Sequence, residues 1–314
     1  MKLTQRSPCK VNLVLNLLGL RPDGFHELET LFFPVPLFDE LSVETIESDS
    51  AQRLTFILSC SNSELPVDSS NLVHRAAASF LQVTGIRTPI RMHLEKNLPL
   101  AAGIGGGSAN AAVTLRLLNR FFGTPLDFQS LNQIAAGLGS DVNFFLQDLP
   151  AIGRGRGEQI EPLPSFDVLQ GKSMVLYHPG FGVSTPWTFK QLADFPDARN
   201  GRPGRAMEVA QSFLSGDWSA AAASLYNGLE GPVLRKYPIL RLYQEFFRQH
   251  GAAATLMSGS GSTTFAIFDH LSQAEAILPA FTESFGTAGW FKVVPCVLPT
   301  SSVSTDPHDS HVTY

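Results

Sequence analysis

Cysteine is scarce in this chain of 314 residues, which contains only Cys9, Cys60 and Cys296. An odd number of widely spaced cysteines fits neither a disulfide framework nor a zinc site, whose cysteine ligands come in close pairs. Charge is sparse as well, because Asp, Glu, Lys and Arg make up 16% of the residues, where about 25% is usual. The cysteine content favours reduced, partly buried thiols in a cytoplasmic protein.

A basic excess and a long apolar run are both missing. The 23 Lys and Arg residues are outnumbered by 28 Asp and Glu residues, and the net charge of −5 argues against a nucleic-acid partner. No stretch approaches the roughly 18 apolar residues of a membrane span, and the first eight residues contain no apolar signal region. Hydrophobic residues still make up 44% of the chain, so we expect a soluble globular protein without a membrane partner.

Strand patterns dominate the first 60 residues. In segment 9–19, apolar and polar residues alternate, so Lys10 and Asn12 are expected on one face of a strand with Val14 and Asn16, away from the more apolar face. The loop 21–29 contains a Pro-Asp-Gly turn. The opposite, apolar face of this strand is expected to carry Cys9, Val11, Leu13, Leu15 and Leu17. Further strands are expected over 31–37, 41–46 and 53–60.

Helical spacing then alternates with strand patterns. A helix is expected over 71–83, with Asn71 as its cap, Gly85 beyond its end, and Leu72, Ala76, Phe80 and Val83 on its apolar face. A strand is expected from residue 90 to Pro99, and two further helices follow, one after the glycines at 103–107 and one over 127–138. The first of these carries Ala111, Leu115, Leu118 and Phe122 on one stripe and ends at Gly123. This mixture without strict alternation predicts an α+β fold.

The second half repeats the mixture. Helices are expected over 204–226, 237–250 and 271–285, and strands over 174–178, 263–268 and 290–298. A length of 314 residues favours about two domains. We therefore expect an N-terminal domain over 1–165, a C-terminal domain over 166–299, and a polar, disordered tail over 300–314.

Four glycines within residues 103–107 lie directly before a predicted helix. Unpaired amides at a helix N-terminus, together with the helix dipole, bind phosphate. The segment lacks the lysine of a Walker A loop and the spacing of the Rossmann fingerprint. A flexible loop without a ligand remains the alternative.

Lys10 and Asp141 are candidates for proton transfer. Asp141 stands between a helix end and an apolar run, where a carboxylate could act as a general base, although an aspartate at such a position is more often a cap or turn residue. Lys10 shares a strand face with asparagines and could steer an anion or lower the pKa of a hydroxyl, although strand lysines are commonly solvent-exposed.

Three further segments are less specific. The second glycine cluster, 257–262, could be a tight connection or a second face closing on the ligand of the first. Phe25 and His26 could stack on a nucleobase. Arg154 and Arg156, spaced by glycines, could meet an anion, although a solvated turn is the simpler interpretation.

The order of these segments is more specific than any one of them. PCKVNLVLNLLGLRPDGFHELET (8–30), LPLAAGIGGGSANAA (98–112), GSDV (139–142) and MSGSGSTTFAIF (257–268) together resemble the GHMP kinase superfamily. The resemblance covers nearly the whole chain except the last 15 or so residues. Within the superfamily, the first block is similar to the kinases that act on 4-diphosphocytidyl-2-C-methyl-D-erythritol in the non-mevalonate isoprenoid pathway.

This resemblance implies an enzyme and its fold. The fold would be a ribosomal protein S5-like N-terminal domain joined to a ferredoxin-like C-terminal domain. The enzyme would be a cytoplasmic monomer or weak homodimer that uses ATP and Mg²⁺ to phosphorylate the 2-hydroxyl of a small substrate with a cytidine diphosphate group. Another GHMP kinase, of the homoserine or mevalonate type, and a non-catalytic nucleotide-binding protein of the same fold are the alternatives. A homoserine or mevalonate kinase would have no use for a base-stacking pocket. The presence of both Lys10 and Asp141 argues against a non-catalytic protein.

The resemblance also implies roles for particular residues. Asp141 matches the catalytic base and Lys10 its partner beside the attacking hydroxyl. The predicted ATP-binding residues are Gly103, Ile104, Gly105, Gly106, Gly107, Ser108, Ala109, Asn110, Asn71, Leu72, Lys96 and Pro99. The predicted substrate-binding residues are Asn12, Phe25, His26, Thr185 and Phe189. No metal ligands are assigned.

Two positions depart from the family's usual residues. Phe25 stands where tyrosine is common, so stacking is retained but a phenol hydrogen bond is lost. Ala109 follows Ser108 where a second serine is often found, which leaves one hydroxyl at this point of the loop.

Overall fold

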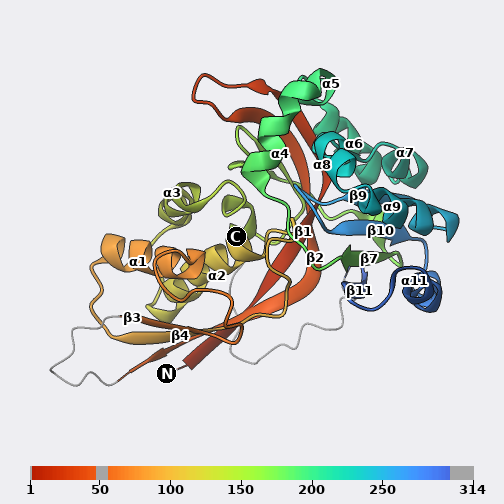
Figure 1. The fold of residues 1–314 in the computed structure, drawn as a ribbon. Helices are drawn as coiled ribbons and strands as arrows, with labels where there is room; N and C mark the ends of the chain where they lie inside the picture. The colour runs from red at the N-terminus through yellow and green to blue at the C-terminus, as the bar shows by residue number, and fades with distance from the viewer. Residues whose placement is uncertain (1, 47–55, 298–314) are drawn as a thin grey trace.

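The computed structural model describes residues 2–46 and 56–297, which form two β-sheets with helices packed against them (Figure 1). Two long strands, β1 (Lys2–Leu20) and β2 (His26–Thr45), form an antiparallel hairpin that runs through the molecule from bottom to top in Figure 1. The other strands of this sheet pair outward from the hairpin in the order β3-β4-β2-β1-β8, with β5 on β2 and β6 on β5. They are β3 (Phe56–Cys60), β4 (Ile90–Glu95), β5 (Ala151–Arg154), β6 (Gln159–Pro162) and β8 (Tyr226–Asn227).

Three helices lie together beside the lower part of the first sheet: α1 (Leu72–Thr84), α2 (Gly106–Phe121) and α3 (Phe128–Leu138). As predicted, the Asn71 side chain accepts a hydrogen bond from the Val73 amide, and Gly85 ends α1 in the left-handed conformation. The predicted apolar face of α1 is wrong at its end, because Val73 is buried whereas Val83 is 58% exposed. A short 3-10 helix, η1 (Asn143–Leu146), follows α3.

The second sheet is antiparallel and has the strand order β11-β7-β10-β9, with β7 (Ser173–His178), β9 (Ala254–Met257), β10 (Thr264–Phe268) and β11 (Trp290–Pro295). In chain order this is 4-1-3-2, the arrangement of a ferredoxin-like fold. Its packed helices are α9 (Ile239–Gln249), α10 (Leu271–Ala276) and α11 (Leu278–Phe285). The α+β prediction is therefore confirmed.

Five further helices lie in the upper half of Figure 1: α4 (Thr185–Gln191), α5 (Pro196–Arg199), α6 (Arg205–Leu214), α7 (Trp218–Ala223) and α8 (Glu230–Lys236). The 3-10 helices of the second half are η2 (Asp167–Leu169) and η3 (Leu192–Asp194). β8, which follows α7, pairs in parallel with β1. The second half of the chain thus adds a strand to the first sheet, and the division at residue 165 stays a prediction.

Several predicted elements have different bounds. The helix expected over 204–226 is α6, α7 and β8, interrupted at Gly216 (φ +80°), and the helix over 271–285 is two helices, α10 and α11. The predicted strands 31–37 and 41–46 belong to one strand, β2. β2 begins at His26, so the predicted loop 21–29 ends at Phe25. The strand predicted over 290–298 ends at Pro295. β5, β6, β9, α4 and α8 were not predicted. The expected tail, 300–314, lies outside the described residues.

A β-bulge changes the face of β1. The pairing with β2 shifts between Asn12 and Val14, so the strict alternation predicted for segment 9–19 breaks there. Lys10 and Asn12 do share a face, as predicted, but Leu15 lines the same cavity as they do. Since the strand is buried on both faces, composition alone does not reveal the shift.

All three cysteines are free thiols, as predicted. In the part of the chain that the structure covers, no helix has the length and hydrophobicity to span a bilayer.

Candidate active site

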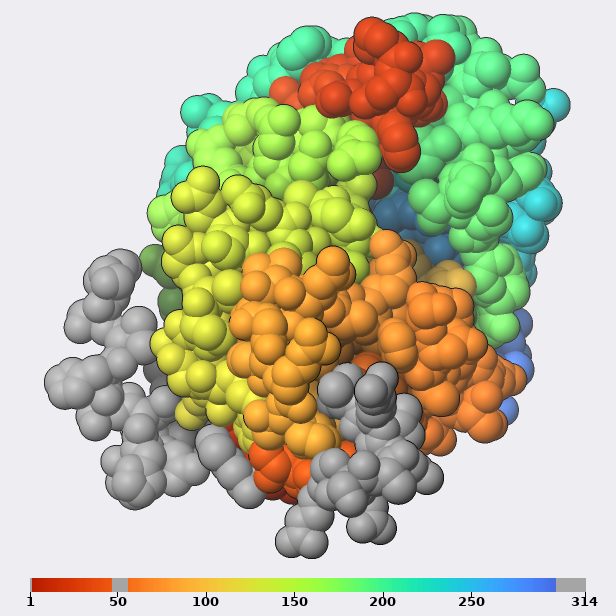
Figure 2. Space-filling model, turned by 90° about the vertical axis from the view of Figure 1, so that its left-hand side faces the viewer, coloured from red at the N-terminus to blue at the C-terminus, as the bar shows by residue number. Residues whose placement is uncertain are grey.

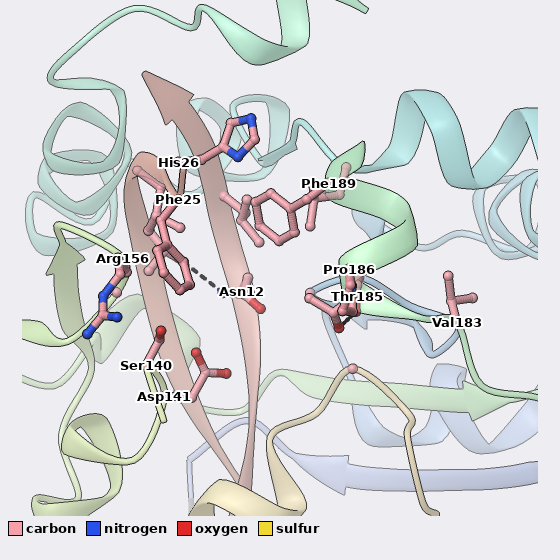
Figure 3. Close-up of a pocket in the computed structure, with 18 of the residues that line it drawn as sticks. Asn12, Phe25, His26, Ser140, Asp141, Arg156, Val183, Thr185, Pro186 and Phe189 are labelled. Atoms are coloured by element: carbon pink, nitrogen blue, oxygen red, sulfur yellow. Dashed lines mark hydrogen bonds between the residues drawn. The ribbon is translucent and has the colours of Figure 1, made fainter. Parts of the chain in front are cut away.

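A cavity of about 1010 Å³ lies between the β1–β2 hairpin and the helices of the second half. In Figure 2 a hollow is visible between the hairpin tip, in red, and the green segment that contains α4. All predicted catalytic and substrate-binding residues line the cavity: Lys10, Asn12, Phe25, His26, Asp141, Thr185 and Phe189. The structure thus brings together side chains from β1, the hairpin loop, the turn after α3, and α4 (Figure 3).

Lys10 is 3% exposed, yet each of its ammonium protons has an acceptor nearby. Nζ donates to Asn12 Oδ1 at 2.7 Å and to the Gly103 carbonyl at 3.2 Å, and it lies 3.3 Å from Asp141 Oδ2. Asn12 in turn donates to Thr30 Oγ1 at 2.7 Å. A buried ammonium with this set of partners is held in one position.

Asp141 lies in the turn between α3 and η1, and its side chain remains 34% exposed. In Figure 3 its carboxylate points into the cavity, opposite Thr185 and Pro186. A carboxylate that is reachable from the cavity can accept a proton from a bound hydroxyl. The cap alternative finds no support, because the Asp141 side chain accepts no hydrogen bond from a described backbone amide.

The glycine loop requires small residues at two points. Gly103 (φ +78°) packs so closely on the second glycine segment that an added Cβ would lie 2.3 Å from the Ser258 carbonyl oxygen. Gly105 (φ +72°) is the N-cap of α2, and an added Cβ would lie 3.1 Å from Lys10 Cε. Both glycines line the cavity. Left-handed backbone and close approach therefore both exclude larger residues here.

The N-terminus of α2 offers unpaired amides. The first helical hydrogen bond runs from the Ala109 amide to the Gly105 carbonyl, so the amides of Gly106, Gly107 and Ser108 have no partner within the helix. No described residue hydrogen-bonds the Ser108 hydroxyl. These donors, with the helix dipole, form the kind of site that accepts a phosphate.

The second glycine segment, 257–262, packs against the first and connects β9 to β10. Its contact with a bound ligand stays a prediction. Ser258 Oγ donates to the Gly103 carbonyl at 3.0 Å, and Gly259 and Ser260 line the same cavity. Ser260 Oγ also lies 2.7 Å from Thr185 Oγ1, which connects this segment to the start of α4.

Lys96 and Asn110, both predicted to bind ATP, have internal partners. Lys96 Nζ lies 2.5 Å from Asp39 Oδ2, and Asn110 Nδ2 donates to the same oxygen at 2.9 Å. Asp39 is fully buried and also accepts hydrogen bonds from the amides of Asn97 and Leu98. No motif surrounds Asp39, so the sequence does not predict this role.

The other predicted ATP-binding residues lie outside the cavity, around the start of α2. A Cβ built on Gly107 would be 3.7 Å from Leu72, and Asn71 caps the helix that begins there. Ile104 and Ala109 are buried, and Pro99 is half-buried in the segment before the loop. Their contact with ATP stays a prediction.

Aromatic side chains form the opposite end of the cavity. Phe25 is 52% exposed, and Figure 3 shows Phe25 and Phe189 on opposite walls. The rings of His26 and Phe189 are 5.2 Å apart, and burial together with nearby Arg199 lowers the pKa of His26. This shift favours the neutral imidazole of His26.

Two arginines line the wall of the cavity, and one of them, Arg156, belongs to the 153–158 loop that could meet an anion. The Arg156 guanidinium lies 4.9 Å from the centroid of the Phe25 ring, and its contact with an anion stays a prediction. Arg199 also lines the cavity. No sequence signal marks it, because it stands in a segment rich in arginine, proline and glycine.

A resident metal centre is not apparent. The described residues, 2–46 and 56–297, include no group of three His, Cys, Asp or Glu side chains arranged to hold a metal ion. Mg²⁺ in kinases is commonly held by one or two carboxylates together with substrate phosphates. Binding of this kind does not require a cluster of three protein ligands. Ser108 and Asp141 are the oxygen-bearing side chains beside the loop that suit this arrangement.

Two family models match the chain: GHMP kinases N terminal domain over residues 71–156, and GHMP kinases C terminal over 209–287. Among curated relatives, the 4-diphosphocytidyl-2-C-methyl-D-erythritol kinase of Rhizobium etli (strain CIAT 652) is 39% identical, with 87% of this chain and 88% of that protein covered. The same-named kinase of Acaryochloris marina (strain MBIC 11017) is 34% identical, with 87% and 89% covered.

Solved structures agree. The chain is similar to a crystal structure of 4-(cytidine 5'-diphospho)-2C-methyl-D-erythritol kinase, with a TM-score of 0.72, 32% identity, and 93% of this chain and 98% of that chain covered. It shares its fold with a homoserine kinase from Cytophaga hutchinsonii at a TM-score of 0.69, 18% identity, and 93% of both chains covered.

Proposed function

Since the chain belongs to the GHMP kinase superfamily and, within it, to the 4-diphosphocytidyl-2-C-methyl-D-erythritol kinases, we propose that it phosphorylates the 2-hydroxyl of that substrate with ATP. The single observation that carries the proposal is one cavity with a Lys10–Asp141 pair at one end and the Phe25–Phe189 pocket at the other. Such a cavity fits a substrate in which a nucleobase and a reacting alcohol are joined by a diphosphate.

The proton of the alcohol goes to Asp141. As the hydroxyl oxygen forms a bond to the γ-phosphorus of ATP, the bond from that phosphorus to the bridging oxygen breaks and ADP leaves. The O–H proton is taken up by the Asp141 carboxylate, which lies 3.3 Å from the Lys10 ammonium. The ammonium lies beside the oxygen that develops negative charge and stabilises it.

The phosphates of ATP lie against the N-terminus of α2. The unpaired amides of Gly106, Gly107 and Ser108 provide donors without a basic surface, which accounts for phosphate binding in a chain of net charge −5. Mg²⁺ bound to ATP is part of the substrate and would neutralise negative charge on the phosphates. The Ser108 hydroxyl is the loop side chain suited to contact either group.

The cytosine base lies between Phe25 and Phe189. Stacking between two aromatic rings needs no hydroxyl on either, so Phe25 performs this part of recognition without the tyrosine oxygen usual at this position. Arg156, behind the Phe25 ring, fixes that ring from its other side.

A coupled assay of ADP release with three alcohols tests the proposal. We expect turnover with 4-diphosphocytidyl-2-C-methyl-D-erythritol and none with homoserine or mevalonate at equal concentration. Homoserine and mevalonate carry no nucleobase for the aromatic pocket. Turnover of either in place of the cytidine compound would overturn the proposal and support another kinase of the same fold.

A further inference from the structure

Arg199, the last residue of α5, lines the cavity beside His26, and its guanidinium has no hydrogen-bond partner among the described residues. Its Nε atom is buried from solvent, and no described residue accepts a hydrogen bond from it. No ion pair joins its guanidinium to a carboxylate of the described chain. Buried donors in folded proteins are nearly always paired, so an unpaired one in a cavity wall indicates a partner supplied from outside the chain.

The charges around the cavity leave Arg199 without compensation. Asp141 is the one acid among the described residues that line it, and Asp141 is paired with Lys10. Arg156 has Glu158 within 3.8 Å. A guanidinium has donors and no acceptors. The missing partner is therefore an acceptor oxygen, most strongly held if it is anionic.

Arg199 has a fixed position relative to the catalytic strand. The residues directly after it are bound to β1, since the Gly201 amide donates to the Leu17 carbonyl at 2.6 Å and Asn16 Nδ2 donates to the Arg202 carbonyl at 2.7 Å. The buried carboxylate of Glu29 accepts the Gly204 amide at 2.7 Å. β1 also carries Lys10 and Asn12, so one strand sets the distance between the reacting end and Arg199.

Resting on the proposed function, we propose that Arg199 is a substrate-binding residue whose Nε–H donates to an oxygen of the cytidine diphosphate group. A phosphate oxygen and an oxygen of the nucleoside share this acceptor chemistry. Burial and the adjacent guanidinium lower the pKa of His26, which disfavours a cationic imidazole that would compete for an anionic oxygen.

Binding of cytidine, CMP and CDP, measured by calorimetry on the full chain, tests the proposal. For Arg199→Met, the loss of a hydrogen bond to a charged group predicts a dissociation constant for CDP raised about 10- to 100-fold. Arg199→Lys keeps the charge but not the Nε–H donor, and it serves if the methionine variant does not fold. Arg202→Met is the matched control, because Arg202 is exposed, pairs with Glu208 and lies outside this cavity.

The three ligands separate the two sources of the oxygen. Weaker binding of CDP with unchanged binding of cytidine places Arg199 on the diphosphate, and equal weakening of both places it on the nucleoside. Either result supports the proposal. Dissociation constants within about twofold of wild type for all three ligands, in a variant that still binds ATP, overturn it. A wild-type protein that binds none of the three would instead contradict the proposed function.

Discussion

Two lysine–aspartate pairs flank the glycine loop, and they differ in what surrounds the carboxylate. Asp141 faces the cavity and is 34% exposed, whereas Asp39 is fully buried. Both lysines are 3% exposed. Cβ atoms built on the neighbouring Gly105 and Gly106 would approach Lys10 Cε and Lys96 Nζ at 3.1 and 3.3 Å, so the loop passes directly between the pairs.

The number of partners explains the difference in role. Asp39 accepts from Lys96, Asn110 and two backbone amides, so its oxygens are fully used and it holds strand, loop and helix together. Among the described residues Asp141 is paired with Lys10 alone, which leaves acceptor capacity for a substrate hydroxyl. A lysine–aspartate pair is thus structural where the carboxylate is buried, and it can be reactive where a carboxylate oxygen faces a cavity.

The largest effect is expected at the open pair. Asp141→Asn removes the proton acceptor and keeps the shape, so kcat should fall about 10²- to 10⁴-fold. The free energy of unfolding should fall by less than on loss of Asp39, because Asn12 and the Gly103 carbonyl still accept hydrogen bonds from the Lys10 ammonium. Single-turnover kinetics and urea unfolding measure the two quantities. Activity near that of wild type would contradict the assignment of Asp141 as the base.

Substitution in the buried Lys96–Asp39 pair should lower the free energy of unfolding. Asp39→Ala leaves the Lys96 ammonium buried without its partner, which should lower the free energy of unfolding by about 3–5 kcal/mol. The control is Asp148→Ala, because Asp148 is 65% exposed in its pair with Arg116, where about 0–1 kcal/mol is expected. Equal losses in urea unfolding for the two variants would show that burial does not distinguish these pairs.

Phe189 tests the other end of the cavity, where we expect the nucleobase to bind by stacking on aromatic rings and not through an ion pair. Phe189→Ala should weaken substrate binding by about 1–3 kcal/mol, the contribution of one stacked base, and raise KM with little change in kcat. Phe128→Ala is a matched control, because Phe128 is 60% exposed on α3 and lies outside the cavity. A fall in kcat at constant KM would place Phe189 in the chemical step.

The smallest effect is expected at a buried group without a charge partner. Burial lowers the pKa of His178, which lies 3.2 Å from Ser262 Oγ. Below its ordinary pKa of 6.5 the unfolded chain binds a proton that the folded chain does not, so stability should fall as pH drops from 7.5 to 5.5. Urea unfolding of His178→Gln should show a smaller fall over this range. An equal fall in the two proteins would exclude this contribution.

Local patterns predicted several parts of the molecule correctly. The cap at Asn71, the shared face of Lys10 and Asn12, and the helix after the glycine run depend on neighbours in sequence. The bulge after Asn12 and the division of the 204–226 helix were missed, because strand register and helix ends depend on contacts with distant segments.

The sequence alone determined the residue types of the site and their order, because a glycine run before a helix, a strand lysine and an isolated aspartate are local signals. Only the tertiary structure decided which charges meet. Lys10 could have paired with either aspartate, and Arg199 carried no signal at all. Folding placed Asp39 under the loop and Asp141 in the cavity, and because burial sets how many partners a carboxylate has, it also separated the structural pair from the reactive one.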